Sequence, residues 1–110
     1  DLIVHRGKKQ EYCAGTIAKI FNELGGHVIY FGKPYPDIYN FCIQKNERVL
    51  AIGDNIRTDI KGANNMKFDS LFIINGIHKS EFLNMPPENY DKIMKSYETN
   101  TTYYQERLEW

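Results

Sequence analysis

Two short segments of this 110-residue chain combine residue types that handle phosphate. One is Gly32-Lys33-Pro34, and the other runs from Gly53-Asp54-Asn55 to Thr58-Asp59. Lysine offers a compact positive charge to phosphate oxygens, and one or two carboxylates together with a phosphate suit Mg²⁺. The glycines allow sharp turns and a close backbone approach. If the two segments meet, they form a site of the kind that phosphoryl transfer needs, which neutralises charge and positions the transferred group.

Each segment also has an ordinary structural interpretation. A Gly-Lys-Pro sequence is most often a turn with a solvated lysine. An acid directly after a strand, such as Asp54, often caps the following helix. For Asp59, an ordinary role as a surface or capping acid is as good an interpretation as a functional one. The functional interpretation therefore depends on the order and spacing of the two segments together.

The elements around these segments alternate between strand and helix. Short apolar runs predict buried strands at Leu2–His5, Val28–Phe31, Arg48–Ile52 and Ser70–Ile74. Helical spacing predicts helices at Tyr12–Leu24 and Pro36–Gln44, a polar loop with a short helix over 55–65, and a short helix near His78–Leu83. This alternation indicates an α/β fold with a parallel sheet. Ligands bind beyond the carboxyl ends of such strands, where Lys33 and Asp54 fall.

Several further side chains receive structural assignments. The apolar face of the second helix predicts that Ile38, Phe41 and Cys42 are buried, and Cys13 is also assigned to a core. The three histidines, His5, His27 and His78, are expected at the surface or in turns. Helical spacing recurs from Tyr90 to Tyr97, and residues 101–110 receive no assignment.

Composition excludes several classes of function. Fourteen Lys and Arg balance fourteen Asp and Glu, so charge gives no reason to expect nucleic acid or an anionic membrane as a partner. No apolar run approaches the roughly 18 residues of a membrane span, and no signal peptide is visible. The two cysteines form no CxxC motif, which argues against a disulfide framework or a zinc site. We therefore expect a cytoplasmic protein.

The segment from Val28 to Gly76 resembles the second half of the core of the haloacid dehalogenase (HAD) superfamily of phosphohydrolases, and more narrowly its subfamily IIA. The resemblance rests on Gly32-Lys33-Pro34 with Pro36, Ile38 and Tyr39, then on Gly53-Asp54-Asn55 with Thr58-Asp59-Ile60 and Gly62-Ala63. It implies that residues 28–110 form the second half of a HAD-type Rossmann-like parallel sheet. Residues 1–27 resemble the end of the family's cap domain.

The resemblance also implies roles for individual residues. Lys33 would steady the negative charge of the nucleophile and of the substrate phosphate, with Gly32 beside it in the substrate site. Asp54 would coordinate Mg²⁺ directly, and Asp59 would hold the water shell of the metal or the lysine. Asn55 would contact the metal through water. The implied substrate is a small phosphorylated metabolite, hydrolysed through an aspartyl-phosphate.

The family's nucleophile is missing from this chain. HAD enzymes carry it in an Asp-x-Asp motif, and here the aspartates stand at positions 1, 37, 54, 59, 69 and 91. The resemblance therefore implies a C-terminal portion of such an enzyme, which is inactive alone and needs the N-terminal half of the core. Without that half, the strand at 49–52 would be an exposed apolar edge, so we expect poor stability or oligomerisation.

Two other functions remain open. The chain could be a non-catalytic remnant of a split or decayed gene, or a phosphate-binding or interaction module without turnover. The intact Lys33, Asp54 and Asp59 favour the phosphatase interpretation over long-standing decay. The substrate cannot be identified, because cap loops set specificity in these enzymes.

Overall fold

The computed structural model of the chain describes residues 2–44 and 46–109, without the side chain of His5. The chain divides into two compact units, one running to Tyr30 and the other starting at Phe31. No helix within the described residues is long and apolar enough to cross a membrane.

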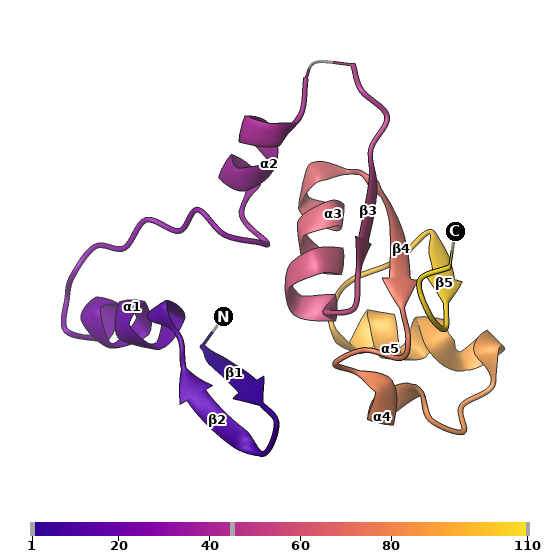
Figure 1. Cartoon of the computed structure of the whole chain (residues 1–110). Helices are drawn as coiled ribbons and strands as arrows, with labels where there is room; N and C mark the ends of the chain where they lie inside the picture. The colour runs from indigo at the N-terminus through magenta and orange to yellow at the C-terminus, as the bar shows by residue number, and fades with distance from the viewer. Residues whose placement is uncertain (1, 45, 110) are drawn as a thin grey trace. The chain divides into compact units, whose positions relative to one another are not determined.

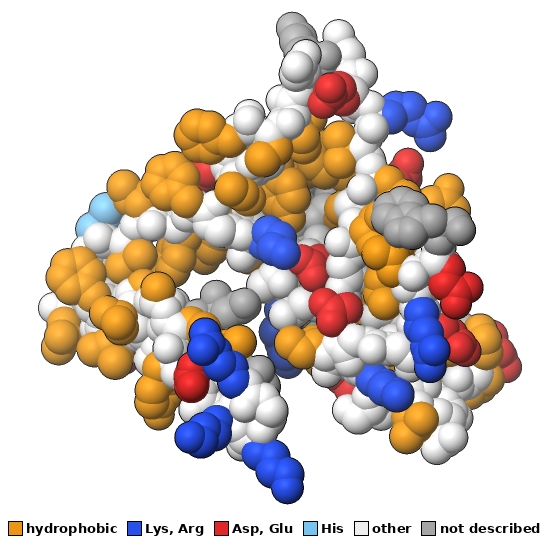
Figure 2. Space-filling view, viewed as in Figure 1, with side chains coloured by type: hydrophobic (Ala, Val, Ile, Leu, Met, Phe, Trp, Pro, Cys, Tyr) orange, Lys and Arg blue, Asp and Glu red, His pale blue; other side chains and the backbone are white. Residues whose placement is uncertain are grey.

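The first unit is a β-hairpin followed by a helix (Figure 1). Strands β1 (Ile3–Arg6) and β2 (Lys9–Tyr12) pair in antiparallel register, and α1 covers Ala14–Glu23. The first strand and the helix are as predicted, whereas β2 lies in a segment for which no strand is predicted. Gly25 follows α1 with a φ of 88°, the left-handed conformation expected after the helix. The apolar side chains of α1 are exposed, as Figure 2 shows, including Ile17 at 70%.

The second unit contains a parallel three-stranded sheet in the order β3-β4-β5. The strands are β3 (Leu50–Gly53), β4 (Asp69–Ile73) and β5 (Tyr103–Gln105), with Gly53 opposite Phe72 and Phe72 opposite Tyr104. The helical elements are α2 (Pro36–Cys42), η1 (Ile56–Ile60), α3 (Lys61–Met66), α4 (Lys79–Phe82), η2 (Pro87–Asn89) and α5 (Tyr90–Ser96). This arrangement confirms the predicted α/β fold with a parallel sheet.

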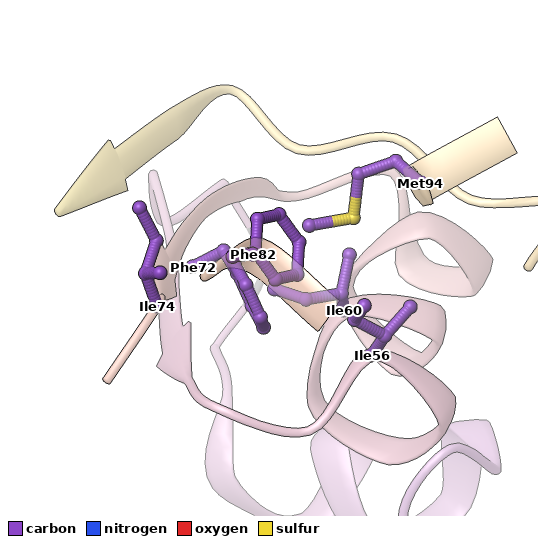
Figure 3. Packing of buried hydrophobic residues seen from close by; sticks show 6 residues of the cluster. All are labelled: Ile56, Ile60, Phe72, Ile74, Phe82 and Met94. Carbon is purple, nitrogen blue, oxygen red and sulfur yellow. The ribbon is translucent and has the colours of Figure 1, made fainter. Parts of the chain in front are cut away.

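The core of this unit lies between the sheet and the helices that follow β3. Figure 3 shows its six apolar members, Ile56, Ile60, Phe72, Ile74, Phe82 and Met94. Phe72 is fully buried on the central strand, and its ring lies 5.1 Å from that of Phe82 and 6.3 Å from that of Tyr104. Full burial of a large apolar side chain contributes about 1.5–3 kcal/mol to stability.

The predicted strand Val28–Phe31 is wrong. The structure has an irregular segment there, in which Ile29 is 69% exposed and Phe31 is 54% exposed. A strand needs a hydrogen-bonded neighbour, and none of the strand pairs in the described residues includes this segment. The apolar run has the composition of a strand, but no strand of the described residues pairs with it.

The predicted buried face of the second helix is also wrong. Phe41 is 79% exposed, Ile38 is 38% exposed and Cys42 is exposed, while Cys13 is only half-buried. The helix turns a different residue inward, because Tyr39 packs edge-on against Phe68 with ring centroids 5.9 Å apart.

The structure tests the histidine prediction and the edge prediction. His78, expected at the surface or in a turn, lies in a turn but is only 3% exposed, whereas His27 is exposed as predicted. The prediction for the His5 side chain lies outside the described residues. Among the described residues, strand β3 pairs on one side only, with β4, and Leu50 is 46% exposed and Ile52 37% exposed. It is the apolar edge that the sequence predicts.

Candidate active site

Lys33 and Asp59 form the central ion pair of the candidate site. Lys33 lies in the loop before α2, and its Nζ is 2.5 Å from Oδ1 of Asp59. The hydrogen bond that Lys33 donates to Asp59 raises the pKa of Lys33, partial burial opposes this, and the negative charge of Asp59 adds to the rise. Weaker contributions come from Tyr39 and Asp54. The ammonium group therefore stays charged at neutral pH.

Asp59 is fixed by the backbone that precedes it. Its Oδ2 accepts a hydrogen bond from the Asn55 backbone N–H at 3.1 Å, and only 12% of its side chain is exposed. A Cβ atom added at Gly53 would overlap the Asp59 carboxylate, so glycine is needed at this strand end. The Asn55 side chain accepts from the Arg57 N–H at 2.9 Å and caps η1.

Asp54 follows β3 directly, and the loop that follows the neighbouring strand, β4, holds its side chain. Its Oδ2 accepts a hydrogen bond from the Ile77 N–H at 3.1 Å. A Cβ atom at Gly76 would overlap the Asp54 side chain, so the loop after β4 presses closely on this carboxylate. Since β3 and β4 are parallel neighbours, their carboxyl ends meet at the same edge of the sheet.

Two contacts place the lysine loop against α3. The Pro34 carbonyl accepts from Asn65 Nδ2 at 3.0 Å, and the Tyr39 hydroxyl lies where a Cβ at Gly62 would stand. Burial raises the pKa of Tyr39, with Lys33 opposing the rise. The Lys33–Pro34 peptide bond is cis. Gly62 therefore makes room for the tyrosine that anchors the lysine loop.

The structure brings most of the predicted site residues together, since Lys33 meets Asp59 and Asp59 meets the backbone of Asn55. Gly32 is exposed, and apart from its chain neighbours no heavy atom of the described residues lies within 4 Å of a Cβ built there, so the backbone at this point is open to solvent. Sequence reasoning missed Gly76 and the Ile77 N–H. The Asn75-Gly76 pair that ends the apolar run was the available signal, because a glycine at a strand end often marks a close approach.

The acidic residues of the site are arranged to give Mg²⁺ one protein ligand, rather than to surround a metal ion with several side chains. No group of three or more His, Cys, Asp or Glu side chains among the described residues is arranged to hold a metal ion. Asp54 uses Oδ2 for the Ile77 bond, and its Oδ1 has no protein donor in the described part. Both Asp59 oxygens accept from protein donors. Mg²⁺ commonly takes one or two carboxylates plus water and phosphate. Asp54 is therefore suited to bind the ion, and Asp59 is suited to hold the lysine.

A family model for HAD-hydrolase-like proteins matches residues 30–99, which include every residue of this site. The chain belongs to this HAD-like hydrolase family. The match begins before the lysine loop and ends after α5. The HAD resemblance of the two motifs is thus confirmed.

Solved structures of HAD-type proteins share the fold. A haloacid dehalogenase-like hydrolase from Brucella suis 1330 is 36% identical over 71% of this chain, with a TM-score of 0.60. A "possible sugar phosphatase" of the HAD superfamily from Cytophaga hutchinsonii is 24% identical over 100% of the chain, with a TM-score of 0.70. A p-nitrophenyl phosphatase from Archaeoglobus fulgidus is 17% identical over 96%, also with a TM-score of 0.70. The chain spans 32%, 40% and 40% of the lengths of these three proteins, respectively. Comparison with curated proteins gives no significant match.

Proposed function

We propose that this chain supplies the lysine and the metal-binding acid of a Mg²⁺-dependent phosphohydrolase whose nucleophile lies outside these 110 residues. The observation that carries the proposal is the placement of the Lys33–Asp59 pair and of Asp54 at the carboxyl edge of the sheet. Family membership and the phosphatase names of two structural neighbours support it. The Lys33 and Asp54 motifs further support subfamily IIA.

Each site residue has a role in this proposal. The Lys33 ammonium, kept charged by Asp59, steadies the charge of the incoming nucleophile and of the substrate phosphate. The open backbone at Gly32 leaves room for the phosphate beside it. Asp54 presents Oδ1 to Mg²⁺, which when bound neutralises phosphate charge.

The proposed substrate is a small phosphorylated metabolite, hydrolysed through an aspartyl-phosphate on the external nucleophile. The chain itself contains no Asp-x-Asp motif. We propose a cytoplasmic location, which the free cysteines Cys13 and Cys42 support.

A second candidate is a phosphate-binding or interaction module without turnover. The exposed apolar edge of β3 favours it, because such an edge accepts another strand without any chemistry. The two proposals share the Mg²⁺ site and differ in turnover once an Asp-x-Asp strand is supplied.

Titration of the ¹⁵N-labelled chain with Mg²⁺, followed by amide NMR, tests the shared site. We expect saturable shifts of the Asp54 and Ile77 amide signals, since the two residues share the Oδ2 hydrogen bond. Asp54→Asn should abolish these shifts. Asp69→Asn is the matched control, because Asp69 starts β4 and so lies at the opposite end of the strand from the site. Shifts that persist in Asp54→Asn would contradict the assignment of the metal ligand.

A further inference from the structure

The loop between β4 and α4 holds Asp54 at two successive residues. Gly76 leaves no space for a Cβ beside the Asp54 side chain, and the Ile77 N–H donates to Asp54 Oδ2 at 3.1 Å. The Ile77 side chain is 63% exposed and the Asn75 side chain is exposed, so neither anchors the loop by burial. The next residue, His78, is only 3% exposed. It is the side chain that ties this part of the loop to the core.

Aromatic neighbours and one carboxylate hold His78 in place. Its ring packs edge-on against Tyr97, the residue that follows α5, with centroids 5.3 Å apart, and lies 6.4 Å from the ring of Phe72. Its Nδ1 is 2.5 Å from Glu81 Oε1. Phe72 pairs with Gly53 in the sheet, and Gly53 immediately precedes Asp54. The His78 ring therefore contacts both Glu81 of α4 and Phe72 of β4, the strand next to Asp54.

Glu81 is itself held by two further side chains. Its Oε2 accepts from the Tyr97 hydroxyl at 2.8 Å, and Arg57 lies over the Tyr97 ring with its guanidinium carbon 4.7 Å from the centroid. Burial works against the charged form of Glu81, but hydrogen bonds from His78 and Tyr97 outweigh it and lower the pKa of Glu81. The carboxylate is therefore ionised at neutral pH and accepts hydrogen bonds only.

This geometry distinguishes the two nitrogens of the His78 ring. Because an ionised carboxylate cannot donate, Nδ1 carries the proton in the bond to Glu81. Nε2 is buried and has no hydrogen-bond partner in the described part of the chain. Within the described residues, all of the polar contacts of the His78 ring thus pass through Nδ1, while its backbone carbonyl accepts from the Glu81 N–H at 2.9 Å.

We propose that His78 is a positioning residue for the metal site, whose Nδ1–H bond to Glu81 holds the loop so that the Ile77 N–H fixes Asp54 Oδ2 and leaves Oδ1 for the cation. The inference rests on the proposed function for the role of Asp54, and it adds a residue that does not itself touch metal or substrate. This positioning role requires a hydrogen-bond donor at the place of Nδ1, and a buried ring alone does not supply it.

Two substitutions separate these requirements. The amide nitrogen of His78→Asn stands near the position of Nδ1 and can donate to Glu81. His78→Gln places its amide near the position of Nε2 and leaves Glu81 without that donor. The first readout is the hydrogen-exchange protection of the Ile77 amide. It is compared with the Thr102 amide, which bonds the Ser70 carbonyl at 3.1 Å and reports on the sheet. The second readout is the Mg²⁺ affinity from the amide titration.

We expect His78→Gln to lower the Ile77 protection, relative to Thr102, by about tenfold, and to weaken Mg²⁺ binding by a similar factor. His78→Asn should keep both quantities within about threefold of wild type. Equal effects of Asn and Gln, or a loss at Ile77 that only matches the loss at Thr102, would overturn the proposal and leave His78 as a packing residue.

The titration of the wild-type chain separates this inference from the proposed function. If Mg²⁺ shifts no amide of the wild-type chain, the metal role of Asp54 fails, and the metal part of the inference fails with it. The Ile77 exchange pattern still decides whether Nδ1 holds the loop. If Mg²⁺ binds normally to His78→Gln while Ile77 loses protection, the proposed function stands and the positioning role is overturned.

Discussion

The described residues before Ile56 and those from Ile56 onward differ sharply in burial. In the first part no side chain is buried, although it contains large apolar residues such as Ile17 and Phe41. In the second part the apolar cluster around Phe72 is nearly inaccessible to solvent. Apolar composition therefore predicts which segments favour burial, but it does not reveal whether a partner lies within the same chain.

The candidate site lies on the boundary between these two regions. Lys33 comes from the open region and reaches Asp59, which stands between the buried residues Ile56 and Ile60. Asn65 and Tyr39 link the lysine loop to α3. The acids are thus positioned by a packed core, whereas the lysine is positioned by a few specific contacts.

The largest expected contrast is between two phenylalanines. Phe72→Ala should cost about 3–5 kcal/mol of unfolding free energy, because it empties the centre of the core. Phe41→Ala should cost less than about 0.5 kcal/mol, because Phe41 is 79% exposed. Urea denaturation followed by circular dichroism measures both. A large loss in Phe41→Ala would show that this side chain is covered in solution.

The next contrast concerns the two sides of the site. In a phosphatase completed by an Asp-x-Asp strand, Lys33→Ala and Asp54→Asn should each lower turnover by about 10²–10³. The exposed Lys92 on α5 provides the control, and Lys92→Ala should leave turnover unchanged. Steady-state hydrolysis of p-nitrophenyl phosphate measures the effect. Wild-type turnover in either site variant would remove that residue from the site.

A smaller effect is expected at the exposed edge of the sheet. We expect the chain to self-associate through β3, and Leu50→Lys should raise the apparent Kd of association by about tenfold or more. Leu83→Lys is the matched control, because Leu83 is 63% exposed but lies outside the strands. Sedimentation velocity over a concentration series measures association. Equal effects of the two lysines would exclude β3 as the contact.

The smallest effect is a loss of stability at alkaline pH. Burial, with a hydrogen bond to Asp91 at 2.8 Å, raises the pKa of Tyr104, and the pKa of Lys33 is raised by Asp59. A raised folded-state pKa gives stability that is present below the unfolded value of about 10 and is lost as pH rises through the folded value.

Thermal melts across this alkaline range test the sign. Tyr104→Phe should reduce the alkaline loss, whereas Tyr103→Phe should not, since Tyr103 is 55% exposed. An alkaline loss that is unchanged in Tyr104→Phe would contradict the role of this phenol.

Part of the fold and site is predictable from local sequence. The apolar runs at β3 and β4 and the glycines beside Asp54 are local signals, and these elements form. The run Val28–Phe31 has the same composition but forms no strand in this structure, since pairing depends on a partner that local sequence does not specify. The sequence does not predict β5, because its residues are polar and aromatic without clear alternation.

The contacts that complete the site depend on tertiary structure. The Ile77 N–H reaches Asp54 across 23 positions, and a backbone donor has no sequence signal. The sequence places His78 at the surface or in a turn, and its burial within that turn is not predictable because it depends on Glu81 and Tyr97. Residue types and spacing, together with the family motifs, single out Lys33 and Asp59, and the structure adds that they form a direct ion pair.

The central claim is that this chain carries the lysine and the metal-binding acid but not the nucleophile of a phosphohydrolase. Mg²⁺-dependent hydrolysis of p-nitrophenyl phosphate by the chain alone tests it most directly, with Asp54→Asn measured in parallel. We expect no Mg²⁺-dependent release of p-nitrophenol above that of the variant. Turnover at an enzyme-like rate that Asp54→Asn abolishes would contradict it, because the chain would then contain its own nucleophile.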